Sequence, residues 1–162
     1  MPRASGDSVN SQPLSAAGTG NDSGDSRRLV VANSLSELGH VSEWVRGFAH
    51  ERGLPHRLAH DLELAVSEAL TNIMSYAYHD DARHDIVIEL HAQPDRIRIA
   101  VEDDGVAFNP LERPAEERPA SLEKSRPNGR GILLMRSITD EMHYLRRDNR
   151  NVLTMVLRCA KT

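Results

Sequence analysis

Several residue types are scarce in this chain of 162 residues, and each shortage excludes a class of protein. Cys159 is the only cysteine, so the chain can form neither an internal disulfide nor a metal cluster held by cysteines. No stretch reaches the ~18 consecutive apolar residues that mark a candidate membrane-spanning helix. The first residues also lack the apolar segment of a secretory signal. We therefore expect a soluble, cytoplasmic protein that works without a membrane.

Positive charge and aromatic side chains are scarce as well. The formal net charge is −4, which argues against a protein that binds nucleic acid through a broad basic surface. Aromatic residues make up 4% of the chain, so the core must consist mainly of aliphatic side chains. Basic residues gather near the C-terminal end, where we favour a solvated hairpin edge over a docking patch for an acidic partner. This basic cluster consists of Arg146, Arg147, Arg150, Arg158 and Lys161.

Residues 1–27 are rich in Ser, Gly, Asn and Asp and poor in large apolar side chains. Such a segment cannot bury enough apolar surface to offset the entropy lost on ordering, so a disordered tail is predicted there. Residues 28–162 are predicted to form one domain. A short β-branched run indicates a strand at 29–32, and apolar residues at helical spacing indicate helices at 35–52 and 55–78.

The second half of the domain is predicted to contain strands around one further helix. Alternating apolar residues predict two hairpins, within 86–101 and 142–157, and the second turns at Asp148 and Asn149. A helix is predicted at 129–137, and the Pro-rich stretch 109–128 before it is predicted to be a lid. The element order β-α-α-β-β-lid-α-β-β indicates an α+β fold, in which helices cover one face of a mixed, mostly antiparallel sheet.

Two polar residues lie at the edge of the apolar stripe of the 55–78 helix. Glu68 and Asn72 are four residues apart, so their side chains are neighbours on the helix surface. The side-chain oxygen of Asn72 is a suitable ligand for Mg²⁺, which prefers hard oxygen donors. Glu68 can orient or deprotonate a nucleophile that attacks a phosphoryl group. Taken alone, the pair also fits an ordinary exposed helix face, because this spacing is frequent in helices.

The segment from Asp103 to Phe108 follows a predicted buried strand. Asp103 can accept a hydrogen bond from the exocyclic amine of adenine, and Phe108 can close such a pocket by apolar contact. Gly105 has no side chain and lets the backbone pass close to a base. The alternative is a simple turn, since Asp-Gly is a common turn dipeptide.

Gly129 and Gly131 lie where the predicted lid meets the last predicted helix. The free N–H groups at a helix start bind anions, so this junction can hold phosphate groups, and an ordinary helix start is the alternative. Arg126 and Arg130 flank the junction and either pair with phosphate oxygens or only solvate the loop. The glycines match neither a Walker loop nor a dinucleotide-binding fingerprint. Together, the three segments predict a site for ATP and Mg²⁺.

Longer stretches around these residues resemble the GHKL ATPase superfamily, and within it the small anti-sigma factor serine-protein kinases of bacterial partner-switching systems. The stretches are LAVSEALTN at 64–72, VEDDGVAFNP at 101–110, GRGILLMRSITDEM at 129–142 and NVLTM at 151–155. The resemblance spans residues 28–158 and implies the Bergerat fold, an ATP-binding α/β sandwich. Ala107 stands where the superfamily often has a second glycine, and the small kinases commonly depart there too.

The resemblance implies a role for each residue of the site. Asn72 corresponds to the magnesium-binding asparagine, Glu68 to the catalytic glutamate and Asp103 to the aspartate that recognises adenine. The glycine-box positions correspond to Gly105, Gly129 and Gly131.

A function also follows from the resemblance. It implies an ATP- and Mg²⁺-dependent protein serine kinase that phosphorylates a STAS-domain antagonist on serine and otherwise binds a sigma factor, typically as a homodimer. One alternative is a nucleotide-gated binding module without phosphotransfer, against which the intact Glu68 argues. Another is the catalytic domain of a sensor histidine kinase, which needs a preceding helix pair with a phosphoacceptor histidine that residues 1–27 are not expected to provide. Gyrase-like and chaperone-like ATPases need a following transducer domain, which we do not expect in a chain of this length.

Overall fold

Three α-helices and five strands form within residues 25–112 and 127–159, the residues that this computed structural model describes. In chain order they are β1 (Ser26–Ala32), α1 (Leu38–Glu51), α2 (His56–Tyr76), β2 (Asp85–Ala92), β3 (Arg96–Asp103), α3 (Pro127–Ile138), β4 (Glu141–Arg147) and β5 (Arg150–Arg158). Short 3₁₀ turns, η1 (Leu35–Glu37) and η2 (Pro110–Glu112), precede α1 and follow β3. The predicted order of helices and strands is confirmed.

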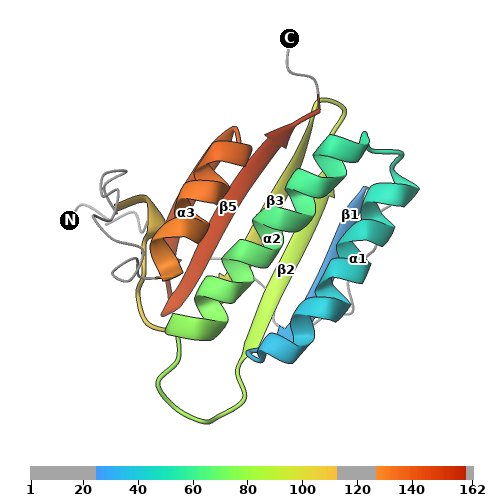
Figure 1. Ribbon diagram of the computed structural model, residues 1–162. Helices are drawn as coiled ribbons and strands as arrows, with labels where there is room; N and C mark the ends of the chain where they lie inside the picture. Colours follow the sequence, from blue (N-terminus) through green and yellow to red (C-terminus); the bar gives the residue numbers. More distant parts are fainter. Residues whose placement is uncertain (1–24, 113–126, 160–162) are drawn as a thin grey trace, which may run out of the picture.

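The five strands form a single sheet in the order β1-β2-β3-β5-β4, and each neighbouring pair is antiparallel. The helices lie side by side on one face of this sheet, with α2 between α1 and α3 (Figure 1). The α+β architecture with helices on one face is therefore confirmed. The turn between β4 and β5 places Asp148 and Asn149 at φ 51° and 60°, the backbone that a two-residue hairpin turn requires.

The core lies between the sheet and the three helices. Strand residues that alternate along the chain, such as Ile86 and Ile88, are fully buried, while the residues between them are partly or fully exposed. Helix α2 contributes Leu62, Val66 and Leu70, which recur at helical spacing and are also fully buried. Among the described residues the buried polar side chains are Asp103 and Asn151. A buried polar group is costly without a hydrogen-bond partner, so these two residues mark a candidate functional site at the core.

The edges of several elements differ from the sequence predictions. Strand β1 begins at Ser26, so Ser26 and Arg27 belong to the sheet and not to the predicted tail. Both residues pair with residues of β2, and this backbone pairing extends β1 although neither side chain is apolar. Helix α3 begins at Pro127, two residues before the predicted start. The rest of the predicted tail and most of the predicted lid, including Arg126, lie outside the described residues.

None of the helices within the described ranges combines the length and the apolar character that crossing a membrane demands.

Candidate nucleotide site

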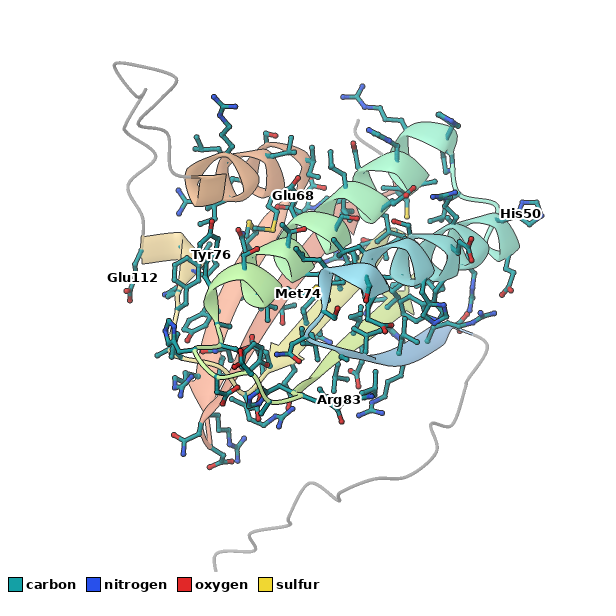
Figure 2. All side chains as sticks on the ribbon, turned by 60° about the horizontal axis from the view of Figure 1, so that its bottom comes forward. His50, Glu68, Met74, Tyr76, Arg83 and Glu112 are labelled. Carbon is teal, nitrogen blue, oxygen red and sulfur yellow. The ribbon has the colours of Figure 1, made fainter. Side chains whose placement is uncertain are left out.

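Helix α2 brings Glu68 and Asn72 against α3. A side-chain carbon placed on Gly131 of α3 would lie 2.5 Å from Oε2 of Glu68 and 3.6 Å from Nδ2 of Asn72. The two polar side chains therefore converge on one point of α3, and Figure 2 shows Glu68 on the side of α2 that lies toward this helix. Only a glycine leaves the space that the Glu68 carboxylate occupies.

Gly131 lies just beyond the first residues of α3. Because α3 begins at Pro127 and proline has no N–H, the free amide groups within its first turn are those of Asn128 and Gly129, and Gly131 follows them. Gly129 and Arg130 are in this first turn, and Arg130 is exposed to solvent. Gly131 allows α3 to pack against Glu68, and its predicted contact with phosphate stays a prediction.

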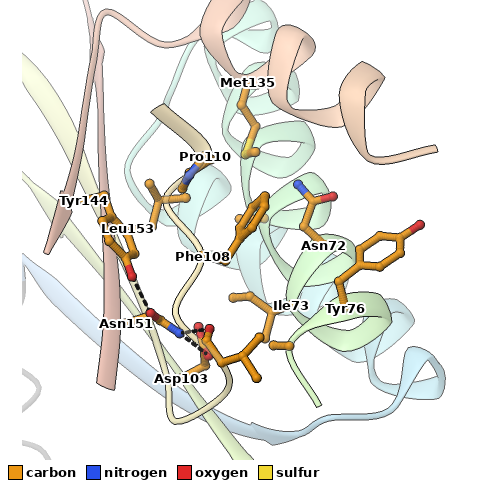
Figure 3. A pocket seen from close by; sticks show the side chains of 13 residues that line it. Asn72, Ile73, Tyr76, Asp103, Phe108, Pro110, Met135, Tyr144, Asn151 and Leu153 are labelled. Atoms are coloured by element: carbon orange, nitrogen blue, oxygen red, sulfur yellow. Dashed lines mark hydrogen bonds between the residues drawn. The ribbon is translucent and has the colours of Figure 1, made fainter. Parts of the chain in front are cut away.

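A pocket of about 560 Å³, including its open mouth, lies beside this contact (Figure 3). Side chains from α2, α3, the end of β3, the segment after it and strands β4 and β5 line it: Ala69, Asn72, Ile73, Tyr76, Ala77, Asp103, Val106, Phe108, Pro110, Met135, Tyr144, Asn151 and Leu153. Most of this lining is apolar, and the polar groups are few. The predicted residues Asn72, Asp103 and Phe108 are thus brought together in one cavity.

The amide of Asn72 has no hydrogen-bond partner among the described residues, and its Nδ2 is fully buried. A buried polar atom without a partner is rare and costly in a folded protein. Because no described side chain holds the amide in one orientation, either its oxygen or its nitrogen can turn toward a ligand. An amide oxygen is a ligand type that Mg²⁺ accepts, so Asn72 fits the predicted metal.

Asp103 lies at the end of β3 with 3% of its surface exposed. Its Oδ1 accepts hydrogen bonds from the backbone N–H of Gly105 at 2.9 Å and from Nδ2 of Asn151 at 3.0 Å. Burial raises the pKa of this carboxyl group, while the two donated hydrogen bonds act in the opposite direction. None of the described residues donates to Oδ2, which therefore remains available to a donor in the pocket.

Gly105 makes a close backbone contact with the end of α2. A side-chain carbon there would lie 2.5 Å from Cβ and 2.6 Å from the carbonyl oxygen of Ala77. The next residue, Val106, donates its N–H to the same oxygen at 2.9 Å. Gly105 is thus required for the close approach of this backbone to α2, which fixes where Asp103 stands relative to Asn72, while its predicted approach to a base stays a prediction.

The structure adds residues to the site that the sequence analysis missed. Asn151 and Tyr144 line the pocket, and Arg146 donates to Oδ1 of Asn151 at 2.9 Å and to the carbonyl of Gly105 at 3.1 Å. Arg146 is exposed on the edge strand of the hairpin, as predicted, and its guanidinium in addition binds polar groups at the pocket. The two-residue turn predicted at Asp148 and Asn149 could have indicated this contact from the sequence, because it sets Arg146 opposite Asn151.

The other described members of the basic cluster fit the predicted hairpin edge. Arg147 lies 3.7 Å from Asp148, and Arg158 donates to Glu141 at 3.3 Å. Arg150 pairs with Glu102 on the neighbouring strand. The outward-facing pairs are at least partly exposed, as expected for solvated strand edges.

Comparison with known proteins agrees with this geometry. Residues 31–157, more than half of the chain, match the family described as the histidine kinase-like ATPase domain. The serine-protein kinase RsbW of Listeria innocua is 30% identical over 119 residues, which cover 71% of this chain and 74% of the relative. The serine/threonine-protein kinase BtrW of Bordetella bronchiseptica is 30% identical over 117 residues, covering 72% of this chain and 82% of BtrW.

A solved structure shares the fold. The crystal structure of the RsbU and RsbW domains of a Mycobacterium tuberculosis protein superposes with a TM-score of 0.59 at 16% identity, covering 82% of this chain. This chain spans 31% of that longer protein.

The chain belongs to the histidine kinase-like ATPase family, the GHKL superfamily. Within it, the chain belongs to the subfamily of anti-sigma factor serine-protein kinases, as its resemblance to RsbW and BtrW shows. Both relatives carry the enzyme class that the sequence predicts for this chain, a protein serine kinase.

Proposed function

We propose that this protein uses ATP to phosphorylate a serine of a STAS-domain antagonist and that, when free of the antagonist, it binds a sigma factor. The observation that carries the proposal is the pairing, in one pocket, of a buried acceptor and an uncommitted amide. Asp103 offers a free carboxylate oxygen there, and Asn72 offers a buried amide without a partner. ATP binding requires the carboxylate oxygen as a partner for the base and the amide as a ligand near the phosphates.

The apolar part of the pocket suits the purine of ATP. Ile73, Phe108 and Met135 present carbon and sulfur atoms to the cavity, while Asp103 is the buried acid beside them. Oδ2 of Asp103 accepts a hydrogen bond from the exocyclic amine of adenine. A guanine base presents a carbonyl oxygen at the same position, which a carboxylate repels, so the site favours adenine.

The phosphate end lies toward Asn72 and the start of α3. Asn72 holds Mg²⁺, which when bound neutralises phosphate charge and polarises the transferred group. The free amide groups of Asn128 and Gly129 in the first turn of α3 bind phosphate oxygens, and the exposed side chain of Arg130 is a further phosphate contact. We expect Arg126, which lies outside the described residues, to act as a further phosphate contact.

Glu68 is the base of the transfer. Its carboxylate accepts the proton of the substrate serine while the serine oxygen attacks the γ-phosphorus. A new P–O bond forms to serine, and the bond from the γ-phosphorus to the bridging oxygen breaks, so that ADP departs with the electron pair. The packing of Glu68 against Gly131 holds the carboxylate in place, one helical turn from Asn72.

Mass spectrometry of a STAS-domain substrate after incubation with ATP and Mg²⁺ tests this function. We expect one added phosphate on serine with the parental protein and at least a hundredfold slower addition with Glu68→Gln. Glu63→Gln is the matched control, because Glu63 is an acid on the same helix that pairs with Arg46 at 3.2 Å, outside the pocket. ATP binding without any phosphate transfer by the parental protein would instead support a nucleotide-gated binding module.

The partner states are tested by separate measurements. Pull-down of a sigma factor is expected to weaken when the unphosphorylated antagonist is added, because the two compete. Light scattering is expected to report a homodimer. A cytoplasmic location, where sigma factors act, is part of the same proposal.

A further inference from the structure

A row of hydrogen-bonded side chains crosses the last three strands under the pocket. The strand register places Asp103 of β3 opposite Asn151 of β5, and Asn151 opposite Arg146 of β4 (Figure 3 shows the first two with Tyr144). All three lie on the face of the sheet that the helices cover. Asn151 is 5% exposed, so its amide depends on protein partners.

The amide of Asn151 has a partner for each of its polar atoms. Its Nδ2 donates to Oδ1 of Asp103 at 3.0 Å and to the carbonyl of Val106 at 2.9 Å. Its Oδ1 accepts from the hydroxyl of Tyr144 at 2.5 Å and from Nη1 of Arg146 at 2.9 Å. A guanidinium can only donate, so Arg146 requires the oxygen of Asn151 on its side. The nitrogen is thereby directed at Asp103.

This orientation decides which oxygen of Asp103 meets a ligand. The amide of Asn151 and the N–H of Gly105 both donate to Oδ1. Rotating the carboxyl group would break both bonds, so Oδ1 stays turned to the sheet and Oδ2 stays free of described donors. Two donors on a buried carboxylate also stabilise its charged form, which is the form that can only accept.

We propose that Asn151, held by Tyr144 and Arg146, is the positioning residue that aims the Asp103 carboxylate and thereby sets the preference of the pocket for bases with an exocyclic amine. The proposal rests on the proposed function, because it assumes that Asp103 meets the base of ATP. Asn151 itself acts through Asp103.

Competition between two nucleotides tests the proposal. The probes are ATP and purine riboside triphosphate, which carries a hydrogen in place of the exocyclic amine and so loses one hydrogen bond. Dissociation constants of both are measured by calorimetry for the parental protein, Asn151→Leu and Leu157→Val. The last is the matched control, because Leu157 is a buried residue on the same strand and the same face but outside the pocket.

We expect the parental protein to prefer ATP by about tenfold or more, the usual worth of a hydrogen bond to a charged group. Asn151→Leu is expected to reduce that ratio at least about fivefold, while Leu157→Val keeps it. Simple destabilisation changes the affinities of both nucleotides together and leaves their ratio unchanged. The ATP affinity of Asn151→Leu is also expected to decline at a higher pH than that of the parental protein, since a donor to Asp103 is gone.

Each failure has its own signature. A parental protein that binds both nucleotides equally would overturn the assignment of Asp103 and the proposed function with it. A parental preference that Asn151→Leu retains would overturn the role of Asn151 alone. If Asn151→Leu does not fold, the double variant Tyr144→Phe with Arg146→Met replaces it, because it removes both donors to Oδ1 and lets the Asn151 amide turn. The same loss of preference is expected, and an unchanged ratio would contradict the proposal.

Discussion

Replacing Gly131 by alanine should separate catalysis from folding and from nucleotide binding. The added carbon would lie 2.5 Å from Oε2 of Glu68, whereas ordinary contacts of such a carbon begin at 3.4 Å. The carboxylate must therefore retreat by about 1 Å, a displacement that can cost about a hundredfold in rate when it affects a catalytic group. The same carbon would lie 3.6 Å from Nδ2 of Asn72, which is an ordinary contact, so Asn72 can stay in place.

The stability of Gly131→Ala should not fall. Alanine is more favourable than glycine inside a helix by up to about 1 kcal/mol, and the group that must move is the end of a flexible side chain. We expect an unfolding temperature equal to or above that of the parental protein and an ATP affinity within about threefold of the parental value. The single-turnover rate of serine phosphorylation at saturating ATP should fall by about ten- to a hundredfold, or about 1.4 to 2.7 kcal/mol in barrier height.

Gly47→Ala is the matched control for this substitution. Gly47 is also inside a helix, α1, and an added carbon there meets no atom within 4 Å. It should gain a similar stability and keep the parental rate. Transfer by Gly131→Ala at the parental rate would refute the claim that Glu68 must stand where this glycine allows it.

Four further predictions concern Gly105, Asp103 and His84. Gly105→Ala should lower the free energy of unfolding by about 1–3 kcal/mol in a denaturant titration, since its new carbon meets the backbone of Ala77 at 2.6 Å; an unchanged midpoint would contradict this packing. Asp103→Asn should weaken ATP binding about tenfold, because the amide can present a donor to the adenine amine. Parental ATP affinity should fall as the pH drops through the raised pKa of Asp103, and a flat pH profile of affinity would speak against an ionised acceptor. The pKa of His84 is raised because Asp80 accepts its hydrogen bond. The contribution of His84 to stability is therefore full below its pKa in the unfolded chain and is lost as the pH rises through its pKa in the folded protein. His84→Asn should remove this part of the pH dependence of unfolding, and a pH profile identical to that of the parental protein would contradict the prediction.

The fold was accessible from the sequence where side-chain periodicity is strong. Alternation in the two hairpins predicted strands whose apolar residues face the core, and the stripe on the 55–78 stretch predicted α2 to within two residues at its C-terminal end. Both patterns arise because one face of each element is buried. The start of β1 was missed, since Ser26 and Arg27 are held by backbone pairing that leaves no apolar pattern.

The site was accessible only in part. Glu68, Asn72 and Asp103 lie on elements that periodicity places, and their chemistry is apparent from their residue types. The role of Gly131 depends on α3 packing against α2, a tertiary contact that local sequence does not encode. Asn151 was missed for a related reason, because its importance comes from cross-strand neighbours, Asp103 and Arg146, that are far from it or on the other side of a turn.

The most direct test of the account is a calorimetric titration of ATP with Mg²⁺ into the purified full chain, repeated with Asp103→Asn and Asn72→Ala. Saturable binding at one site per chain is predicted for the parental protein, with the affinity reduced about tenfold or more in each variant. No heat of binding at millimolar ATP, or equal affinities in all three proteins, would contradict the claim that this pocket holds the nucleotide.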